Sequence, residues 1–289
     1  MQTKGTTEVA RPSSGARSGP HSVGDWLVLP TVGYLLLIFV VPLGLLVVGS
    51  FLVDGRFSVQ NFVDYLGDAH SRSVVGATIR YAATVSFLCL ALGYPFARVM
   101  AAAPSRAQAL LFAIVLIPMS VSIIVRAFGW TVLLRREGLV NDLFLAFGVV
   151  DHPVRLLFTE GGLVLGSVGV QLPLMILPIY TVVRSIPSEF GDAGACLGAG
   201  PLYRLLRLDL PLALPGMIAG FSIVFCQTAA AYVIPSLLGG SRFKTMSSTI
   251  VDSYLVLQAG ALGSTVSVML LAIISMIIAA SGALTPGRR

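Results

Sequence analysis

The segment "DAGACLGAGPLYRLLRLDLP" (residues 192–211) decides how this chain is interpreted, because it is polar and lies between two long apolar runs. It carries two aspartates and two arginines beside glycines and prolines, a composition more typical of soluble protein. Charged side chains are unfavourable inside a lipid bilayer. The chain must therefore leave the apolar phase at this segment and return to it afterwards.

The composition of the whole chain indicates an integral membrane protein. Of its 289 residues, 56% are hydrophobic and 11% are charged, and the mean hydropathy is +0.89, whereas soluble domains carry about 25% charged residues. A span needs roughly 20 apolar residues, and it must be helical because lipid offers the backbone no hydrogen-bond partner. The runs are too long and too continuously apolar for the strands of a membrane barrel. We predict an all-α polytopic membrane protein with six transmembrane helices, at Leu27–Phe51, Val75–Val99, Ala109–Leu133, Gly162–Val183, Leu212–Leu238 and Leu262–Leu284.

The predicted domains follow from these runs. Residues 1–25 are rich in Ser, Gly, Thr and Pro and lack apolar periodicity, so we expect a disordered tail. Residues 26–52 form an appended first helix, and residues 75–284 form the main domain, with five helices and a polar loop at 184–211. Lys and Arg number ten on the side of the N-terminus and seven on the other, which predicts that both termini are cytoplasmic. Small residues suited to close helix contact recur in the fourth and fifth spans: Gly162, Gly166, Gly169, Gly216 and Gly220.

The connections that face outward carry two further short helices. The spacing of Leu139, Leu143 and Phe147 predicts one apolar stripe on a helix lying at the membrane interface. The stretch "TMSSTIVDSYLVLQ" (residues 245–258) predicts another short mixed helix. The outward connections are residues 52–74, 134–161 and 239–261.

The polar loop contains helix-starting and helix-ending residues at the positions expected for two short helices joined by a glycine. Ser188 suits the N-cap of a helix that begins near Glu189, and Gly198 suits the left-handed residue that ends it. Pro201 suits the first position of a second helix. Pro211 is expected to turn the chain into the fifth span. We predict a compact elbow that is too polar to enter lipid and is able to insert into a groove on another protein.

The spacing within the elbow resembles that of the permease subunits of bacterial ABC importers. Their cytoplasmic loop has the pattern E-A-A, three residues, G, nine residues, I, one residue, L-P. The Asp and the Leu that replace the Glu and the Ile keep charge and bulk, whereas a Gly in place of the second Ala loosens the helix by up to about 1 kcal/mol. The matching residues are Asp192, Ala193, Gly194, Gly198, Leu208, Leu210 and Pro211.

The resemblance implies a type I importer permease fold in which the elbow is the coupling helix. This helix would dock on a separate ATP-hydrolysing subunit through residues 188–204. The implied partners are a second homologous permease, a dimer of ATP-binding subunits and a periplasmic or lipid-anchored solute-binding protein, in the inner membrane of a bacterium. This chain would bind no cofactor, since ATP and Mg²⁺ belong to the ATPase. The residues implied in coupling are Glu189, Asp192, Ala193, Gly194, Gly198, Leu210 and Pro211.

Other stretches resemble the permeases of spermidine/putrescine importers. The resemblance covers about residues 30–284 and implies that the chain forms half of the path for a small organic solute, with a polyamine favoured. Related permeases carry other small organic solutes. The stretches are "ALGYPFARVMA" (91–101), "VRAFGWTVLLRREGLVND" (125–142), "DHPVRLLFTE" (151–160) and "LGAGPLYRLLRLDLPLALPGMIAG" (197–220).

The sequence lacks motifs for chemistry of its own. A phosphate loop needs Gly before its Lys, and the two lysines, Lys4 and Lys244, follow Thr and Phe. The His and Cys residues lack metal-ligand spacing, and no nucleophile motif is present. The net charge of +6 suits a membrane surface and gives no reason to invoke nucleic acid. We predict a transport subunit that is not itself an enzyme.

A stand-alone secondary carrier or channel is the alternative, and a non-transporting membrane scaffold is a third possibility. Proton-coupled carriers use carboxylates or histidines within their spans. The six predicted spans contain neither, although they include Arg80 near an outer end and Arg126. Arg126 either extends outward to water or lies in the bundle as a gate or ion-pair partner. This composition favours a carrier with an external source of energy.

A path for ammonium groups is expected to offer aromatic faces and acidic side chains. Aromatic residues also serve in packing, and glutamines also join helices by hydrogen bonds, so both interpretations stay open. The candidate path residues are Arg126, Trp130, Tyr81, Gln171, Tyr180, Gln227 and Tyr232, and the outer acidic candidates are Asp142, Asp151, Glu160 and Asp252.

Overall fold

A computed structural model describes residues 23–53, 56–148, 150–187, 196, 198, 200–240 and 243–284 of the chain. It confirms the all-α prediction, because the regular elements among the described residues are helices apart from one antiparallel ribbon of two-residue strands, β1 (Leu52–Val53) and β2 (Arg56–Phe57). The chain has two compact units, residues 1–45 and 46–289.

The first predicted span is a helix, α1 (Val23–Phe51), which contains Pro30 and Pro42. Its part up to residue 45 is the described portion of the first unit. Its last turn belongs to the second unit and lies against the final helix, because a Cβ added at Gly49 would be 3.2 Å from the Ser264 Oγ.

The second span begins earlier than expected. The helix of this span is α3 (Ala69–Ala102), which extends beyond the predicted Val75–Val99 at both ends. A short helix, α2 (Gln60–Gly67), precedes it. Asp68 caps α3 by accepting hydrogen bonds of 2.8 Å from both the backbone N–H and the hydroxyl of Ser71. The hydrogen bond from the Ser71 backbone, and after it the bond from the Ser71 hydroxyl, hold the pKa of the Asp68 carboxyl below its usual range.

The third span, predicted at Ala109–Leu133 with a kink at Pro118, is broken into two helices. Helix α4 (Ser105–Leu116) runs into a 3₁₀ turn, η1 (Ile117–Ser120), and α5 (Ile123–Leu133) leaves it at an angle of 102°. Pro118 lies in the turn and cannot donate a backbone hydrogen bond to the preceding helix. Within the described ranges, five helices are long and apolar enough to cross a membrane, or six if the bent pair counts as one span.

The fifth span also ends early. Helix α10 (Leu210–Ala230) stops before the predicted Leu238, and a π-helical turn, η3 (Pro235–Gly239), follows it. In a continuous helix Pro235 would offer no N–H to the carbonyl of Ala231, and its ring would clash with that carbonyl. The Ser247 hydroxyl donates to the Ala229 carbonyl over 2.9 Å, so part of the freed backbone is satisfied by a side chain.

Both predicted short helices in the outward connections are confirmed. They are α6 (Leu139–Ala146) and α11 (Met246–Leu255). The remaining helices among the described residues are α7 (Glu160–Arg184), α9 (Pro201–Arg204), the π-helical turn η2 (Leu205–Asp209) and α12 (Gly260–Leu284).

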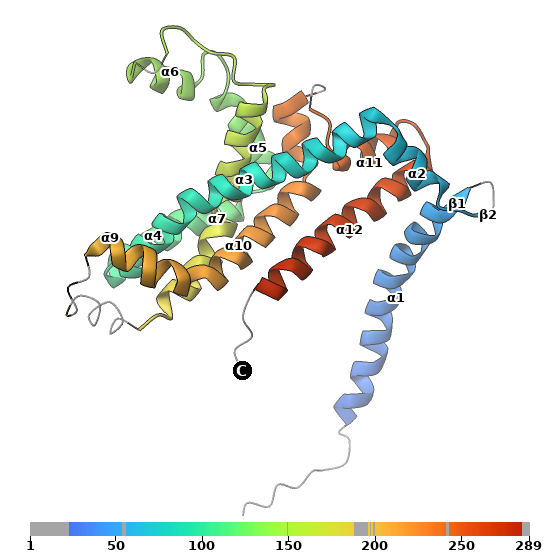
Figure 1. Ribbon diagram of the computed structural model, residues 1–289, viewed down its shortest axis with the longest axis horizontal. Helices are drawn as coiled ribbons and strands as arrows, with labels where there is room; N and C mark the ends of the chain where they lie inside the picture. Colours follow the sequence, from blue (N-terminus) through green and yellow to red (C-terminus); the bar gives the residue numbers. More distant parts are fainter. Residues whose placement is uncertain are drawn as a thin grey trace, which may run out of the picture. The chain divides into compact units, whose positions relative to one another are not determined.

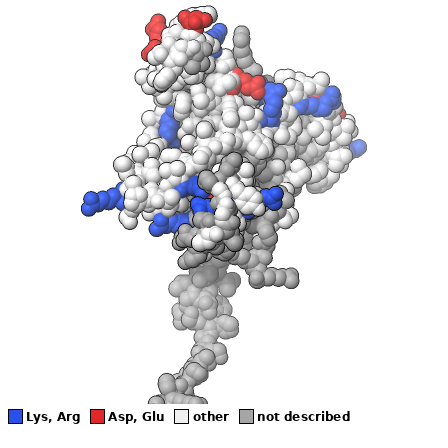
Figure 2. Space-filling view, turned by 60° about the vertical axis from the view of Figure 1, so that its left-hand side comes forward, with Lys and Arg blue, Asp and Glu red and all other residues white. Residues whose placement is uncertain are grey.

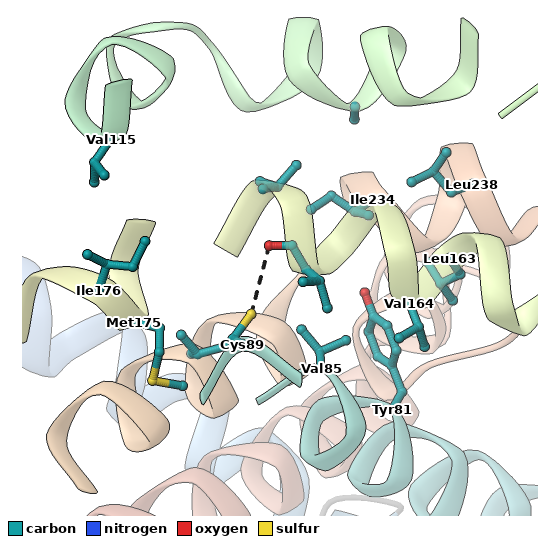
Figure 3. Close-up of a cluster of buried hydrophobic side chains, with 14 of the residues drawn as sticks. Tyr81, Val85, Cys89, Val115, Leu163, Val164, Met175, Ile176, Ile234 and Leu238 are labelled. Carbon is teal, nitrogen blue, oxygen red and sulfur yellow. Dashed lines mark hydrogen bonds between the residues drawn. The ribbon is translucent and has the colours of Figure 1, made fainter. Parts of the chain in front are cut away.

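Helices α3, α7 and α10 pack side by side in the second unit, with α5 against α7 and α12 against α10 (Figure 1). Their facing side chains form the core (Figure 3), where the Cys89 sulfur of α3 points at the Val168 carbonyl of α7 from 3.8 Å. Helices α6 and α11 lie at one end of this bundle, called here the α6 end, and α9 lies at the other, called the elbow end (Figure 1).

Glycines allow the core helices to approach closely. A Cβ at Gly216 of α10 would be 2.9 Å from the Pro178 carbonyl oxygen, and one at Gly220 would be 2.8 Å from the Met175 sulfur. A Cβ at Gly169 of α7 would be 2.0 Å from the ring of Trp130 on α5. Residue size at these positions therefore limits how near the helices can lie.

Replacing Gly169 with Ala is expected to destabilise the bundle by about 1–3 kcal/mol, because the Trp130 ring must move out of a well-packed site. The loss is measured as a lower midpoint of thermal unfolding in detergent. Gly76→Ala on α3 is the matched control, since a Cβ there has no neighbour within 4 Å. Equal midpoints for the two variants would contradict the packing assigned to Trp130.

Candidate functional site

The elbow end contains the predicted glycine turn. Gly198 has a φ of +76°, the left-handed conformation expected from the sequence. A Cβ placed on it would meet no atom within 4 Å, so the glycine is required by the backbone and not by crowding. Helix α9 begins at Pro201, as predicted. The predicted coupling residues Glu189, Asp192, Ala193 and Gly194 lie outside the described residues.

The chain leaves the elbow differently from the prediction. Pro211 does not turn the chain, because α9, η2 and α10 follow one another without an intervening loop. Pro211 lies in the first turn of α10, next to Leu210, and because helix precedes it, its missing N–H removes one backbone hydrogen bond between η2 and α10. The preceding π turn is closed by the Leu210 N–H and the Leu205 carbonyl.

Apolar side chains are presented to the surroundings at the elbow. Tyr203 is 59% exposed and Leu206 is 54% exposed, and Pro211 is exposed too. Tyr203 precedes the candidate membrane span Leu205–Ala230, whereas Leu206 and Pro211 lie within it.

Several predicted path residues meet on one stretch of α7, residues 166–171. The Tyr81 hydroxyl lies 2.5 Å from the Ser167 hydroxyl, and the Trp130 ring lies over Gly166 and Gly169. The Arg126 Nη1 donates to the Val170 carbonyl over 3.2 Å. Arg126 thus lies within the bundle and does not extend outward.

The same stretch also contacts α10. The Gln171 side chain donates to the Thr228 hydroxyl at a long 3.5 Å, beside Gln227, which is exposed. Tyr232 is 39% exposed and lies in the gap between α10 and η3. Tyr81 is only 1% exposed, so in this chain it is a core residue.

Tyr180 lies apart from the other predicted path residues. It is nine positions beyond Gln171 on α7, roughly 13 Å at the helical rise. Its hydroxyl accepts a hydrogen bond of 3.0 Å from Gln108 of α4, and its ring meets Phe112 edge-on with centroids 4.8 Å apart. Tyr180 therefore joins α4 to α7 near the elbow end.

A hollow of about 400 Å³ near α6 was not anticipated from the sequence. It is lined by Arg135, Arg136 and Arg155, which are exposed and have no ion pair within the described part of the chain. Asn141 is fully buried and holds the two arginine-bearing segments together. Its side chain donates to the carbonyls of Arg135 and Val154, both over 3.0 Å, and accepts from the Val154 N–H.

The outer acidic candidates are partly neutralised by cations. Glu160 pairs with Arg80 over 3.0 Å, and Asp252 pairs with Lys244. In Figure 2 the visible acidic side chains gather toward the top, whereas Lys and Arg are spread over the face. Among the described residues no group of three or more His, Cys, Asp or Glu is placed to hold a metal ion.

Broken spans, a glycine-packed bundle and a polar elbow together define a membrane-spanning permease, and the fold is that of the type I ABC importer permeases. The chain is similar over 91% of its length to a chain of a bacterial alginate ABC transporter crystallised in complex with alginate pentasaccharide-bound periplasmic protein. That likeness has a TM-score of 0.71 at 18% identity and covers 95% of the other chain.

The family described as the binding-protein-dependent transport system inner membrane component matches residues 93–285, and the chain belongs to this family. Its relatives include the spermidine/putrescine transport system permease protein PotB of Escherichia coli (strain K12), 27% identical over 260 residues, covering 87% of this chain and 94% of the relative. The protein of the same name from Haemophilus influenzae is 28% identical over 252 residues, covering 85% of this chain and 88% of the relative.

Proposed function

We propose that this chain forms one half of the translocation path of an ATP-driven importer, and that its cargo is a polyamine such as spermidine or putrescine. The observation that carries the proposal is the elbow, in which Gly198 has a left-handed φ and a helix begins at Pro201, as expected if this segment is a coupling loop. The names of the relatives support the choice of cargo.

In this proposal the elbow receives the force of ATP binding. An ATPase dimer docks on the elbow through residues 188–204, where the exposed Tyr203 offers apolar contact area. ATP and Mg²⁺ are held by that dimer and not by this chain. Closure of the dimer draws the elbow toward that of a second, homologous permease, and α10 moves with it because helix is continuous from η2 into the span.

A polyamine carries several ammonium groups, which bind aromatic faces and polar oxygens. Tyr232 and Gln227 suit this role because both are exposed and lie where α10 is interrupted. The buried Tyr81 and the bonded Gln171 suit the role of support behind them. Irregular backbone at membrane depth is tolerated where it lines a cavity or is buried in protein, which supports a path beside the break.

The α6 end is proposed to face the periplasm and to receive the solute-binding protein, and both termini are proposed to lie in the cytoplasm. Arg135, Arg136 and Arg155 form a fixed positive surface that fits carboxylates on that protein. The same charges repel free cations in solution. A polyamine would therefore reach the path by delivery from its binding protein rather than by direct capture.

The complete complex in vesicles is expected to accumulate labelled spermidine or putrescine only when ATP is present on the elbow side. Vesicles that hold this chain alone are the control and should accumulate nothing. Accumulation by this chain alone without nucleotide would instead support a stand-alone carrier. Recovery of a different solute with the purified binding protein would contradict the polyamine assignment.

Gly198→Val is expected to abolish uptake and retention of the ATPase during purification, while the protein still inserts. The left-handed conformation costs residues with a Cβ roughly 1–2 kcal/mol, and β-branching adds to this. Gly198→Asn should be milder because Asn tolerates that conformation. Gly200→Val is the control, since Gly200 also has open space but no left-handed φ. Full uptake by Gly198→Val would contradict the role of the elbow in coupling to the ATPase.

Reversing the charges of Arg135, Arg136 and Arg155 to Glu is expected to weaken association with the binding protein by about tenfold or more and to reduce its dependence on salt. Affinity measured at two salt concentrations gives both quantities. Arg56→Glu, an exposed residue of β2 outside the hollow, is the matched control. An unchanged affinity and salt dependence would place the docking surface elsewhere.

A further inference from the structure

An ion pair joins the C-terminal end of the elbow to α3, whereas the chain itself continues from the elbow into α10. Asp209 is the last residue of η2, and its Oδ2 lies 2.5 Å from the Nη1 of Arg98 on α3. The contact lacks the alignment of a hydrogen bond, so its attraction is that of the opposite charges. Both side chains are about one-third exposed, at 36% and 28%, which leaves the pair only partly screened by water.

The pair borders a hollow of about 210 Å³ that both ends of the elbow share. Pro187, where the chain enters the elbow, and Asp209, where it leaves, both line this hollow. The opposite wall is the end of α3, with Arg98 and Ala102. The elbow ends therefore have room to shift against α3 while the long arginine side chain keeps its contact.

The π turn determines where Asp209 points. A π turn contains about one residue more than an α-helical turn, which rotates the residues after it by about 100°. Short π segments of this kind are frequent at functional sites. Asp209 stands at the end of this turn and faces α3, and it has no other ion pair within the described part of the chain.

The contact continues from α3 to the third span. The Gln108 amide of α4 donates to the Met100 carbonyl of α3 over 3.2 Å and to the Tyr180 hydroxyl of α7 over 3.0 Å. Met100 lies two positions beyond Arg98. A displacement of the elbow that pulls on Arg98 thus acts on the end of α3 to which α4 is also bonded.

We propose that Arg98 and Asp209 are positioning residues that transmit the movement of the elbow to α3 and α4, in addition to the direct path into α10. This inference rests on the proposed coupling of the elbow to an ATPase. It predicts that without the pair the ATPase still binds, but binding of nucleotide to the ATPase no longer changes the position of α3.

The test uses the complete complex, with Ala102→Cys as a reporter at the end of α3 and the native cysteines Cys89, Cys196 and Cys226 replaced. Reaction with a maleimide is followed with and without a non-hydrolysable ATP analogue. Nucleotide is expected to change the rate by about fivefold or more in the parent, and Arg98→Gln and Asp209→Asn to reduce this to less than about twofold. Arg98→Lys and the exchanged pair Arg98→Asp with Asp209→Arg are expected to restore the response.

Ile186→Val is the matched control, because it changes an uncharged side chain that lines the same hollow and keeps both members of the ion pair. It should respond as the parent does. A full response in Arg98→Gln, or no response at Ala102→Cys in a parent complex that retains its ATPase, would overturn the inference. Failure of the parent to retain an ATPase would contradict the proposed function instead, so the two failures are distinguishable.

Discussion

The close contact of α7 with its neighbours is the constraint on which the other features depend. In lipid, helices gain little hydrophobic energy from meeting each other, so their association relies on close packing and on hydrogen bonds. Met175 is fully buried between Gly93 of α3 and Gly220 of α10, whose missing side chains make room for it. Its flexible thioether fills the irregular space between three helices. Both ends of the bundle are held in register by this central contact.

The third and fifth spans are both interrupted, and both contact residues 166–171 of α7, the third span through α5 and the fifth through α10. Helix α5 starts directly after one break, and Arg126 in its first turns reaches the Val170 carbonyl. The other break separates α10 from η3 and leaves Tyr232 exposed. Irregular backbone and polar side chains thus occur at the same places, as they do where a membrane protein lines a passage. Helices α3 and α7, which pack against both interrupted spans, are themselves continuous.

Hydropathy was enough to locate the spans, because lipid imposes helix on any apolar run of sufficient length. It did not tell which prolines interrupt a helix: Pro173 and Pro178 lie inside a continuous α7, whereas the chain breaks at Pro118. The difference depends on whether neighbouring helices can satisfy the freed carbonyls, which is tertiary information. The conformation of Gly198 was predictable from spacing alone. The Arg98–Asp209 ion pair and the hydrogen bonds of Asn141 to Val154 could not be predicted, because no sequence pattern connects the residues that they join.

The fit of Trp130 over Gly166 and Gly169 has a consequence for biogenesis. Helix α5 leaves the ribosome before α7 exists, so the broken third span enters the membrane without the glycine face that later receives its indole ring. Until then Arg126 also lacks the Val170 carbonyl and remains a bare charge at the insertion site. Stable integration of the third span is therefore completed only when the fourth has been synthesised, which makes the two a single unit of insertion.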